Sequence, residues 1–437
     1  MDWQNALILI LGSLLFLMMI GMPVALAFLV VNIIGILIWW GGEPGLRQLI
    51  LSIRQSVTTF TLLPVPLFIL MGEVMFHSGL AVRMIFTLEK WLGHLPGRLS
   101  LLAVGAGTLF GTMSGSSMAS GALLGSVLVP EMEKQGYKKS MSLGPILGSG
   151  GLAVMIPPSG FAVVLGAIAE ISIGKTLIAI IVPGILMAVL YVVYIITRCY
   201  LQPSIAPAYE VKPTPLSEKL RDTARYILPL GLIIFAVIGF IFLGIATPAE
   251  AAASGTLAAL ILTAAYGKLN WAMLKKSVLA TTELSVMILF IIACAEVYSQ
   301  ILAFSGATKG LIALVTRLKV DPIFIIIGMA IVLLILGMFI PVYPIMMITI
   351  PVFMPIVQSL GYDLIWFGVI FILCMEMGAT SPPFGLVLFV VKGVAPPGTT
   401  MGDCYRGALP FLACDLVALI LIIAFPMITL WLPLMMR

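Results

Sequence analysis

The sequence predicts an all-α integral membrane protein, because the chain is too apolar to be soluble and because apolar runs of membrane-spanning length recur along it. Of its 437 residues, 61% are hydrophobic and 9% are charged, whereas soluble domains carry about 25% charged residues. A soluble fold of this composition would expose a largely apolar surface. A third observation, internal repetition at a fixed spacing, predicts that the helices form two related halves.

The apolar runs are candidate membrane helices, since crossing the hydrocarbon core takes about 20 apolar residues. They cover residues 6–40, 99–130, 177–196, 227–242, 278–304, 323–340, 364–391 and 409–434. The first run is too long for one simple span. No Lys or Arg precedes Arg47, so the N-terminus lacks the basic start of a secretory signal and is expected to be retained as a helix.

The charged and sulfur-containing residues exclude several classes of protein. The net charge of +5 is spread along the chain, which fits the positive-inside bias of membrane proteins and not a nucleic-acid surface. The five cysteines are scattered without a Cys-x-x-Cys pair, so neither zinc nor a disulfide framework is indicated.

The stretch 198–225 divides the chain near its middle. It combines four prolines with basic residues such as Arg198, Lys212 and Arg225, which predicts a connector outside the membrane on its cytoplasmic side. We therefore divide the chain into a first repeat (1–197), this connector and a second repeat (226–437).

The two repeats share proline and glycine landmarks at one constant spacing. Pro23 matches Pro248, Pro130 matches Pro355, Tyr137 matches Tyr362 and Pro157 matches Pro382, each pair 225 residues apart. Proline is frequent in this chain, so a single match is weak evidence of duplication. Four matches at one offset across most of a half are strong evidence. Secondary transporters are often built from such inverted repeats around a site near the middle of the bilayer.

Two stretches in equivalent positions are amphipathic. Residues 46–59 carry Arg47 and Arg54, and residues 271–282 carry Lys275 and Lys276. Both suit helices lying along the membrane interface, and ordinary cytoplasmic loops are the alternative.

The segment Gly111–Gly121 contains four serines and three glycines inside an apolar run. Unpaired backbone in lipid costs several kcal/mol, so this segment must be buried in protein or line a wet cavity. A re-entrant hairpin at about 105–130 satisfies that requirement, and its hydroxyls and free carbonyls suit sodium. A small-residue packing seam explains the segment equally well.

Two Pro-Pro pairs favour the ion-site interpretation. Pro157-Pro158 and Pro382-Pro383 each remove two amide donors, so the preceding carbonyls lose their helical partners. We expect broken helices at about 143–170 and 365–391. A second hairpin is expected at about 330–356; it is less polar than the first, with Tyr343 and Thr349 as its polar side chains.

Several glutamates lie in apolar surroundings, where an acid is costly and usually faces a cavity or a partner. Helix capping or ion pairing explains most of them, and Glu376, directly before the second break, is the strongest functional candidate. The sequence contains no phosphate-binding loop and no paired nucleophile and base, so we do not expect an enzyme.

The Gly-Thr-Met-Ser-Gly-Ser-Ser segment, the two Pro-Pro breaks and the duplication together resemble the large membrane subunit of tripartite ATP-independent periplasmic (TRAP) transporters. The resemblance covers essentially the whole chain. It implies an elevator-type transporter of the bacterial cytoplasmic (inner) membrane that imports a small organic acid with Na+ as coupling ion. It also implies two partners, a small four-helix membrane subunit and a periplasmic substrate-binding protein.

The resemblance also implies two sodium sites. The first would use Ser114, Ser117, Ala153, Ile156 and Pro157, and the second Gly337, Gly378, Thr380 and Ser381. Ala153 stands where the family usually has glycine, and Pro341 stands where relatives often have an acid. The candidate solute contacts are Ser116, Ser159, Tyr343 and Glu376.

Three alternatives remain open from the sequence. A stand-alone sodium/carboxylate symporter would need no binding protein or small subunit. An ion channel would pass single-channel current, which two occluding hairpins argue against. An intramembrane enzyme would need a nucleophile paired with a base.

Overall fold

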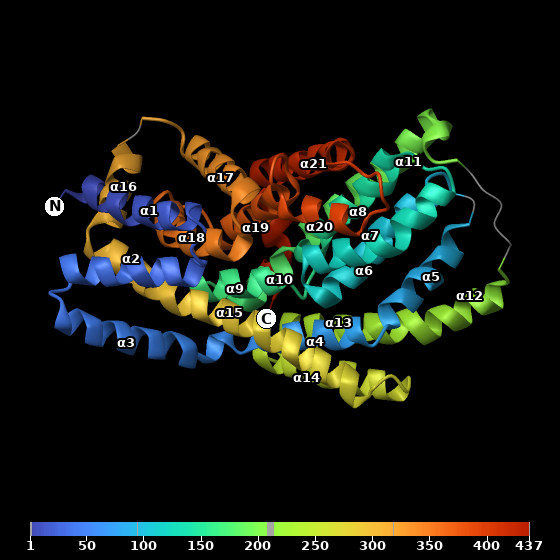
Figure 1. Ribbon diagram of the computed structural model, residues 1–437, viewed down its shortest axis with the longest axis horizontal. Coiled ribbons are helices and arrows are strands. Elements are labelled where there is room, and N and C mark those ends of the chain that lie inside the picture. Colours follow the sequence, from blue (N-terminus) through green and yellow to red (C-terminus); the bar gives the residue numbers. More distant parts are fainter. Residues whose placement is uncertain (1, 94, 208–213, 318, 437) are drawn as a thin grey trace.

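The computed structural model describes residues 2–93, 95–207, 214–317 and 319–436, and every regular element within them is a helix (Figure 1). Eight of these helices are long and apolar enough to cross a membrane, or up to nine if the bent pair α8–α9 counts as one span. The prediction of an all-α membrane protein is therefore confirmed.

The long N-terminal run divides into two helices, as its length required. Gly21 has a φ of +86°, a conformation that side chains disfavour, and Pro23 follows it at the start of the next helix. The elements of this region are α1 (Trp3–Met19), α2 (Val24–Trp39), α3 (Glu43–Thr58), η1 (Phe60–Leu62) and α4 (Pro64–His77).

The next region contains the first predicted hairpin and the first break. Helices end and restart around Gly115 and again around Pro157–Ser159. The elements are α5 (Leu80–Leu92), α6 (Arg98–Ser114), α7 (Ser117–Lys134), α8 (Lys139–Met155), α9 (Gly160–Ile168), α10 (Ile173–Ala179) and α11 (Ile181–Leu201).

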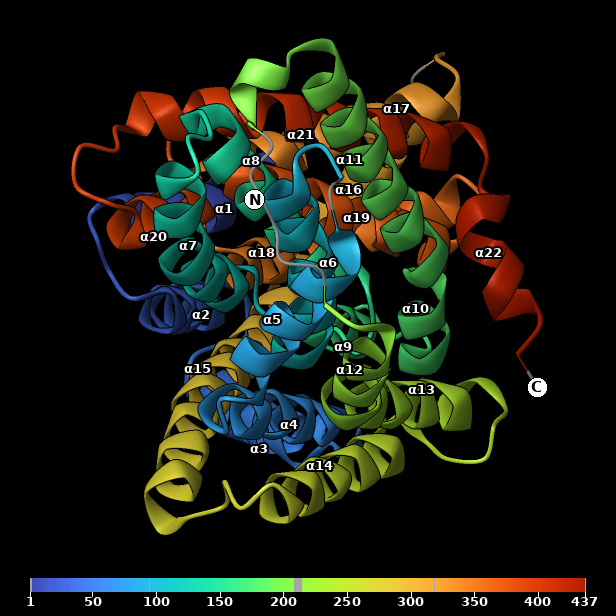
Figure 2. The same ribbon diagram turned by 90° about the vertical axis from the view of Figure 1, so that its right-hand side faces the viewer.

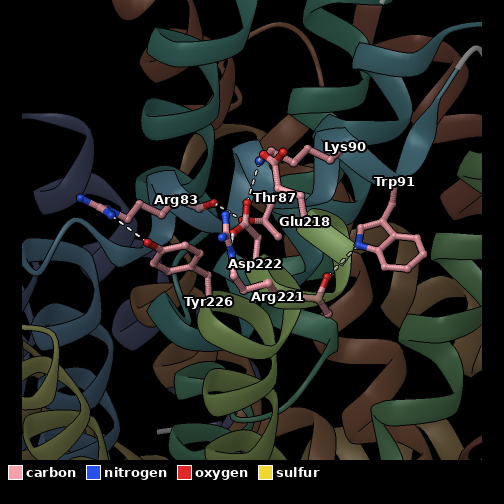
Figure 3. Close-up of polar contacts among 9 residues, drawn as sticks. Arg83, Thr87, Lys90, Trp91, Glu218, Arg221, Asp222 and Tyr226 are labelled. Carbon is pink, nitrogen blue, oxygen red and sulfur yellow. Dashed lines mark hydrogen bonds and ion pairs between the residues drawn. The ribbon is translucent and has the colours of Figure 1, made fainter. Parts of the chain in front are cut away.

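The predicted connector is partly helical, and its residues 208–213 lie outside the described residues. Its end packs on α5: Lys90 is bonded to Glu218 and Asp222, at 2.6 Å each, and the Trp91 indole donates to Thr223 (Figure 3). The elements that follow α11 are η2 (Pro203–Ile205), α12 (Leu216–Asp222), η3 (Thr223–Ile227), α13 (Leu228–Phe242), α14 (Pro248–Ala265) and α15 (Trp271–Phe304).

Helix α15 is longer than the sequence interpretation expected. Residues 271–282 are its first turns and do not form a separate interfacial helix, because nothing breaks the 34-residue helix up to Phe304. The Asn270 side chain caps its start by accepting from the Met273 amide.

The last region repeats the order of hairpin and broken helix. Helices stop at Ile340–Pro341 and at Ser381–Gly385. The elements are α16 (Ala307–Arg317), α17 (Pro322–Phe339), α18 (Val342–Ser359), α19 (Leu364–Thr380), α20 (Leu386–Val394), α21 (Met401–Ala424) and α22 (Met427–Leu434). Whether the paired helices re-enter the membrane or cross it, and whether the halves are inverted, remain predictions.

The helices form two groups that lie against each other (Figure 2). One group is a layer of α2, α3, α4, α13, α14 and α15, tied by buried bonds such as that from the Asn32 amide to the Cys294 carbonyl at 2.6 Å. The other group surrounds α8 and α19, whose residues 141–155 and 366–380 are all buried. These two stretches lie 225 residues apart, so the two central helices occupy equivalent positions in the predicted repeats.

Candidate ion and solute site

The tip of the first hairpin is a sharp reversal between α6 and α7. Gly115 has a left-handed φ of +57°, and its amide closes α6 on the Gly111 carbonyl at 2.8 Å. Ser116 then caps α7, its hydroxyl oxygen accepting from the Ala119 amide at 3.3 Å. The glycine and serine of this segment thus reverse the chain and start a new helix.

The first Pro-Pro pair separates α8 from α9. Ile156 is extended after the last turn of α8, and the buried Ser159 caps α9 by accepting from the Ala162 amide at 3.4 Å. The hairpin tip touches this break, since a Cβ added to Gly115 would lie 3.4 Å from the Gly160 nitrogen.

Close helix packing fixes the tip and the break relative to each other. A Cβ on Gly111 would overlap the Cα of Ala153, and a Cβ on Gly107 would overlap Ser149. Glycine therefore lets α6 approach the backbone of α8. The side chain of Ser117 is buried against α8 at Gly150, where an added Cβ would meet Ser117 Cβ at 3.4 Å.

The predicted members of the first sodium site whose side chains the structure describes thus lie near one another. Ser117, Ala153, Ile156 and Pro157 all belong to the facing ends of α7 and α8. Ser114 is the last residue of α6, but its side chain lies outside the described residues.

The predicted second site is built on a similar backbone contact. A Cβ on Gly337 would lie 2.9 Å from Gly378 Cα, and one on Gly378 would lie 2.6 Å from Gly337 Cα. The buried hydroxyls of Thr380 and Ser381 donate to carbonyls of the last turn of α19, at 3.1 and 2.7 Å from Met377 O. Each hydroxyl oxygen keeps lone pairs with which it can bind a cation.

Three of the four candidate solute residues lie at one contact between the first break and the second hairpin. The ring of Tyr343, at the start of α18, packs edge-on against Phe161 of α9 with centroids 5.1 Å apart. A Cβ on Gly160 would lie 4.0 Å from the Tyr343 hydroxyl. Ser116 and Ser159 cap the helices beside this contact, whereas Glu376 lies in the core.

The glutamates of the apolar runs differ sharply in their surroundings. Glu73 pairs with His77 at 3.3 Å, Glu250 caps α14 through Thr247, and Glu296 accepts from the Gln300 amide. Glu170 and Glu283 are exposed. Glu376 alone of the six is 2% exposed with no hydrogen-bond partner for either carboxylate oxygen among the described residues.

Sequence reasoning missed a second buried acid near Glu376. Asp415 of α21 accepts a hydrogen bond from the Tyr191 hydroxyl of α11, and both are buried. The signal was present, because Asp415 lies inside the apolar run 409–434 and an acid there needs a partner.

A cavity of 810 Å³ lies between the two helix groups. One wall comes from α3, η1 and α15, including Ser52 and Gln300, and the other from the α9–α10 loop and α18. Its volume suits a small solute. Its charged lining residues are Glu170 and Glu296, with no Lys or Arg among the described residues that line it.

The comparisons with known proteins agree with this architecture. The family model described as "Tripartite ATP-independent periplasmic transporter, DctM component" matches residues 11–428. The chain is 34% identical over 390 residues to the C4-dicarboxylate TRAP transporter large permease protein DctM of Pseudomonas aeruginosa, covering 89% of each chain. It is 30% identical to the 2,3-diketo-L-gulonate TRAP transporter large permease protein YiaN of Escherichia coli, covering 93% of this chain and 94% of that protein.

A further relative and one solved structure extend the comparison. The ectoine TRAP transporter large permease protein TeaC of Halomonas elongata is 28% identical, covering 95% of this chain and 96% of that protein. The Alcanivorax borkumensis YdaH transporter has the same fold, with a TM-score of 0.63 at 18% identity over 88% of this chain and 89% of that one. With its apolar helices, the chain is a multi-pass protein of the bacterial inner membrane, and it belongs to the DctM family of TRAP transporter large permease proteins.

Proposed function

We propose that this chain imports a small organic acid, driven by the sodium gradient, through an elevator movement of the group around α8 and α19 against the layer of α2, α3, α4, α13, α14 and α15. It would work with a small four-helix membrane subunit and receive its solute from a periplasmic binding protein. The observation that carries the proposal is the meeting of hairpin tip and helix break at Gly115 and Gly160.

The residues support sodium as the coupling ion. Proline pairs end α8 and α19 where hydroxyls and carbonyls lie close together, and oxygen atoms are the ligands that hard cations take. The elevator step is supported by the architecture, because α5 and α16 link the two helix groups in sequence. We propose only the class of the solute, a small organic acid, because the relatives are named for different solutes: a C4-dicarboxylate, a diketo-gulonate and ectoine.

Uptake into proteoliposomes tests the proposal. The chain is reconstituted with its small subunit and binding protein, sodium is imposed outside and then replaced by potassium, and the assay is repeated with Ser114→Ala/Ser117→Ala. We expect uptake that requires sodium and the binding protein and that falls in the double variant. Sodium-dependent uptake without the binding protein would instead indicate a stand-alone symporter, and uptake indifferent to sodium would refute the coupling.

A further inference from the structure

Glu376 is a buried acid whose carboxylate has no cationic partner among the described residues, and the Ser117 hydroxyl lies close enough to act on it. Glu376 is 2% exposed, and neither oxygen has a hydrogen-bond partner among the described residues. Leaving a buried ionised carboxylate unpaired costs several kcal/mol. An acid at such a position is therefore either protonated or paired with a cation.

The side chain of Glu376 points from α19 into α8 and the first hairpin. A Cβ on Gly150 would lie 3.6 Å from Glu376 Oε1 and 3.4 Å from Ser117 Cβ, so the carboxylate and the serine flank the same glycine. A Cβ on Gly151 would lie 3.2 Å from Glu376 Cγ, which is tight. The two glycines leave the room that this acid occupies.

The main chain of Glu376 belongs to the other candidate site. Its carbonyl accepts from the Thr380 hydroxyl at 3.1 Å, and Gly378, which touches Gly337, follows two residues later. The backbone of Glu376 thus belongs to the second break, while its side chain reaches the first hairpin.

Basic side chains of the helices packed on α19 do not compensate Glu376. Helix α19 carries no Lys or Arg, and the basic residues of α8, α10, α20 and α21 are exposed or partly exposed: Lys139, Lys175, Lys392 and Arg406. Another acid, Asp415, lies close enough to act on Glu376, and it accepts a hydrogen bond from the Tyr191 hydroxyl. That hydroxyl also lies beside Gly151, 3.7 Å from the position of an added Cβ. A proton or a cation from solution is the remaining compensation, and only a cation makes the folded protein respond to sodium.

We propose that Glu376 supplies the negative charge of the sodium site formed by Ser117 and the end of α8. This assignment rests on the proposed function, which offers only neutral hydroxyls and carbonyls at that site. In this assignment the second half supplies the carboxylate of Glu376. The first half supplies Ser117 and the two glycines, Gly150 and Gly151, that leave room for the carboxylate.

Sodium-dependent thermal stability of the purified full chain tests the assignment without any transport assay. Unfolding midpoints are measured in detergent over a series of NaCl concentrations, with choline chloride holding the ionic strength constant. Ligand binding to the folded state raises the midpoint by mass action. For the unchanged protein we expect a saturable rise with sodium.

Glu376→Gln should need about tenfold more sodium for the same stabilisation, the size expected when one charged interaction of about 1.4 kcal/mol is lost. Its midpoint without sodium should equal or exceed that of the unchanged protein, because an uncompensated charge is gone. Glu376→Asp should fall between the two. Glu283→Gln, the same change at an exposed position of α15, should match the unchanged protein.

Gly151→Ala is the second variant, should Glu376→Gln fold poorly. It keeps the carboxylate but presses on Glu376 Cγ, so it should also weaken the sodium response. A sodium response that survives both variants would overturn the role of Glu376 and leave the proposed function intact. A protein that shows no sodium response in its unchanged form would overturn both.

Discussion

The two pairs of hairpin and broken helix share a backbone plan and differ in chemistry. In the first, Gly111 packs against Ala153, the tip turns through a left-handed glycine, and Ser116 caps the second helix. In the second, Gly337 packs against Gly378, the chain turns through an extended Ile340, and α18 starts after Pro341 with no side-chain cap. The hydroxyls of the predicted ion sites thus lie on the hairpin in the first half, at Ser117, and at the end of the broken helix in the second, at Thr380 and Ser381.

The difference is sharpest where the halves touch. Glu376 lies 225 residues after Gly151, so the repeat makes them counterparts, and they face each other across α8 and α19. A carboxylate at both positions would place two buried acids in contact, which like charges disfavour. At these equivalent positions the second half therefore carries a carboxylate, Glu376, and the first half carries a glycine, Gly151, which leaves room for it.

The largest expected effect comes from filling the glycine contacts that both halves share. Gly111→Ala and Gly378→Ala each place a Cβ against backbone, and such overpacking costs about 1–3 kcal/mol or more. We expect a clear fall in the unfolding midpoint and loss of uptake. Gly105→Ala in α6 and Gly328→Ala in α17, where a Cβ meets nothing within 4 Å, are the matched controls. Equal tolerance of all four changes would contradict the close packing.

Removing one hydroxyl from each half separates the two candidate ion sites. Ser117→Ala and Ser381→Ala should each raise the sodium concentration for half-maximal uptake by about tenfold, as expected for losing one oxygen ligand worth about 1–1.5 kcal/mol. Ser126→Ala, at an exposed hydroxyl that bonds its own helix, serves as control. If only one of the two changes raised the sodium concentration for half-maximal uptake, only one of the two proposed sites would depend on a hydroxyl.

A smaller effect is expected at Tyr343, where the second hairpin meets the first break. Tyr343→Phe keeps the edge-on packing on Phe161 and removes only the hydroxyl. If that hydroxyl binds solute, the KM for uptake should rise about fivefold while the sodium dependence stays unchanged, since one neutral hydrogen bond is worth about 1 kcal/mol. An unchanged KM would remove Tyr343 from the solute contacts.

Sequence patterns located the helix breaks because those breaks are local. Gly115 ends α6 through its own φ, and Pro157 and Pro382 lack the amide that a continuing helix needs. The pattern did not reveal the pairing of Tyr191 with Asp415 or the space at Gly151, because both depend on which helices cross. The constant offset identifies counterparts, but it does not say that they touch.

The same limit applies to the amphipathic stretches. Lys275 and Lys276 predicted a separate interfacial helix, yet α15 continues through them. Nothing after residue 282 breaks the helix, and its packing on α2, α3 and α4 runs along its length. The composition correctly identified residues 271–282 as more polar, but it did not reveal that they continue into the membrane-spanning part of α15.

The smallest effect is expected where the two linking helices differ. Helix α5 is held by the connector through Lys90, Glu218 and Asp222 (Figure 3), whereas α16 rests on α1, with Gly310 directly against the ring of Trp3. Hydrogen bonds and charges of Asp222 and Glu218 raise the pKa of Lys90. The contact is thus complete at neutral pH and is lost as the pH rises beyond about 10. It is also lost in acid, as the pH falls through the pKa of Asp222, which the hydrogen bond with Lys90 lowers.

Lys90→Met tests this contact because it keeps the length of the side chain and removes the charge. Partly exposed ion pairs contribute about 0–1 kcal/mol, so we expect a small drop in the unfolding midpoint that shrinks further in high salt. Uptake should change by less than about threefold if the contact only supports α5. A larger loss at an unchanged midpoint would mean that the connector controls the movement of α5, which the ion-pair energy alone cannot explain.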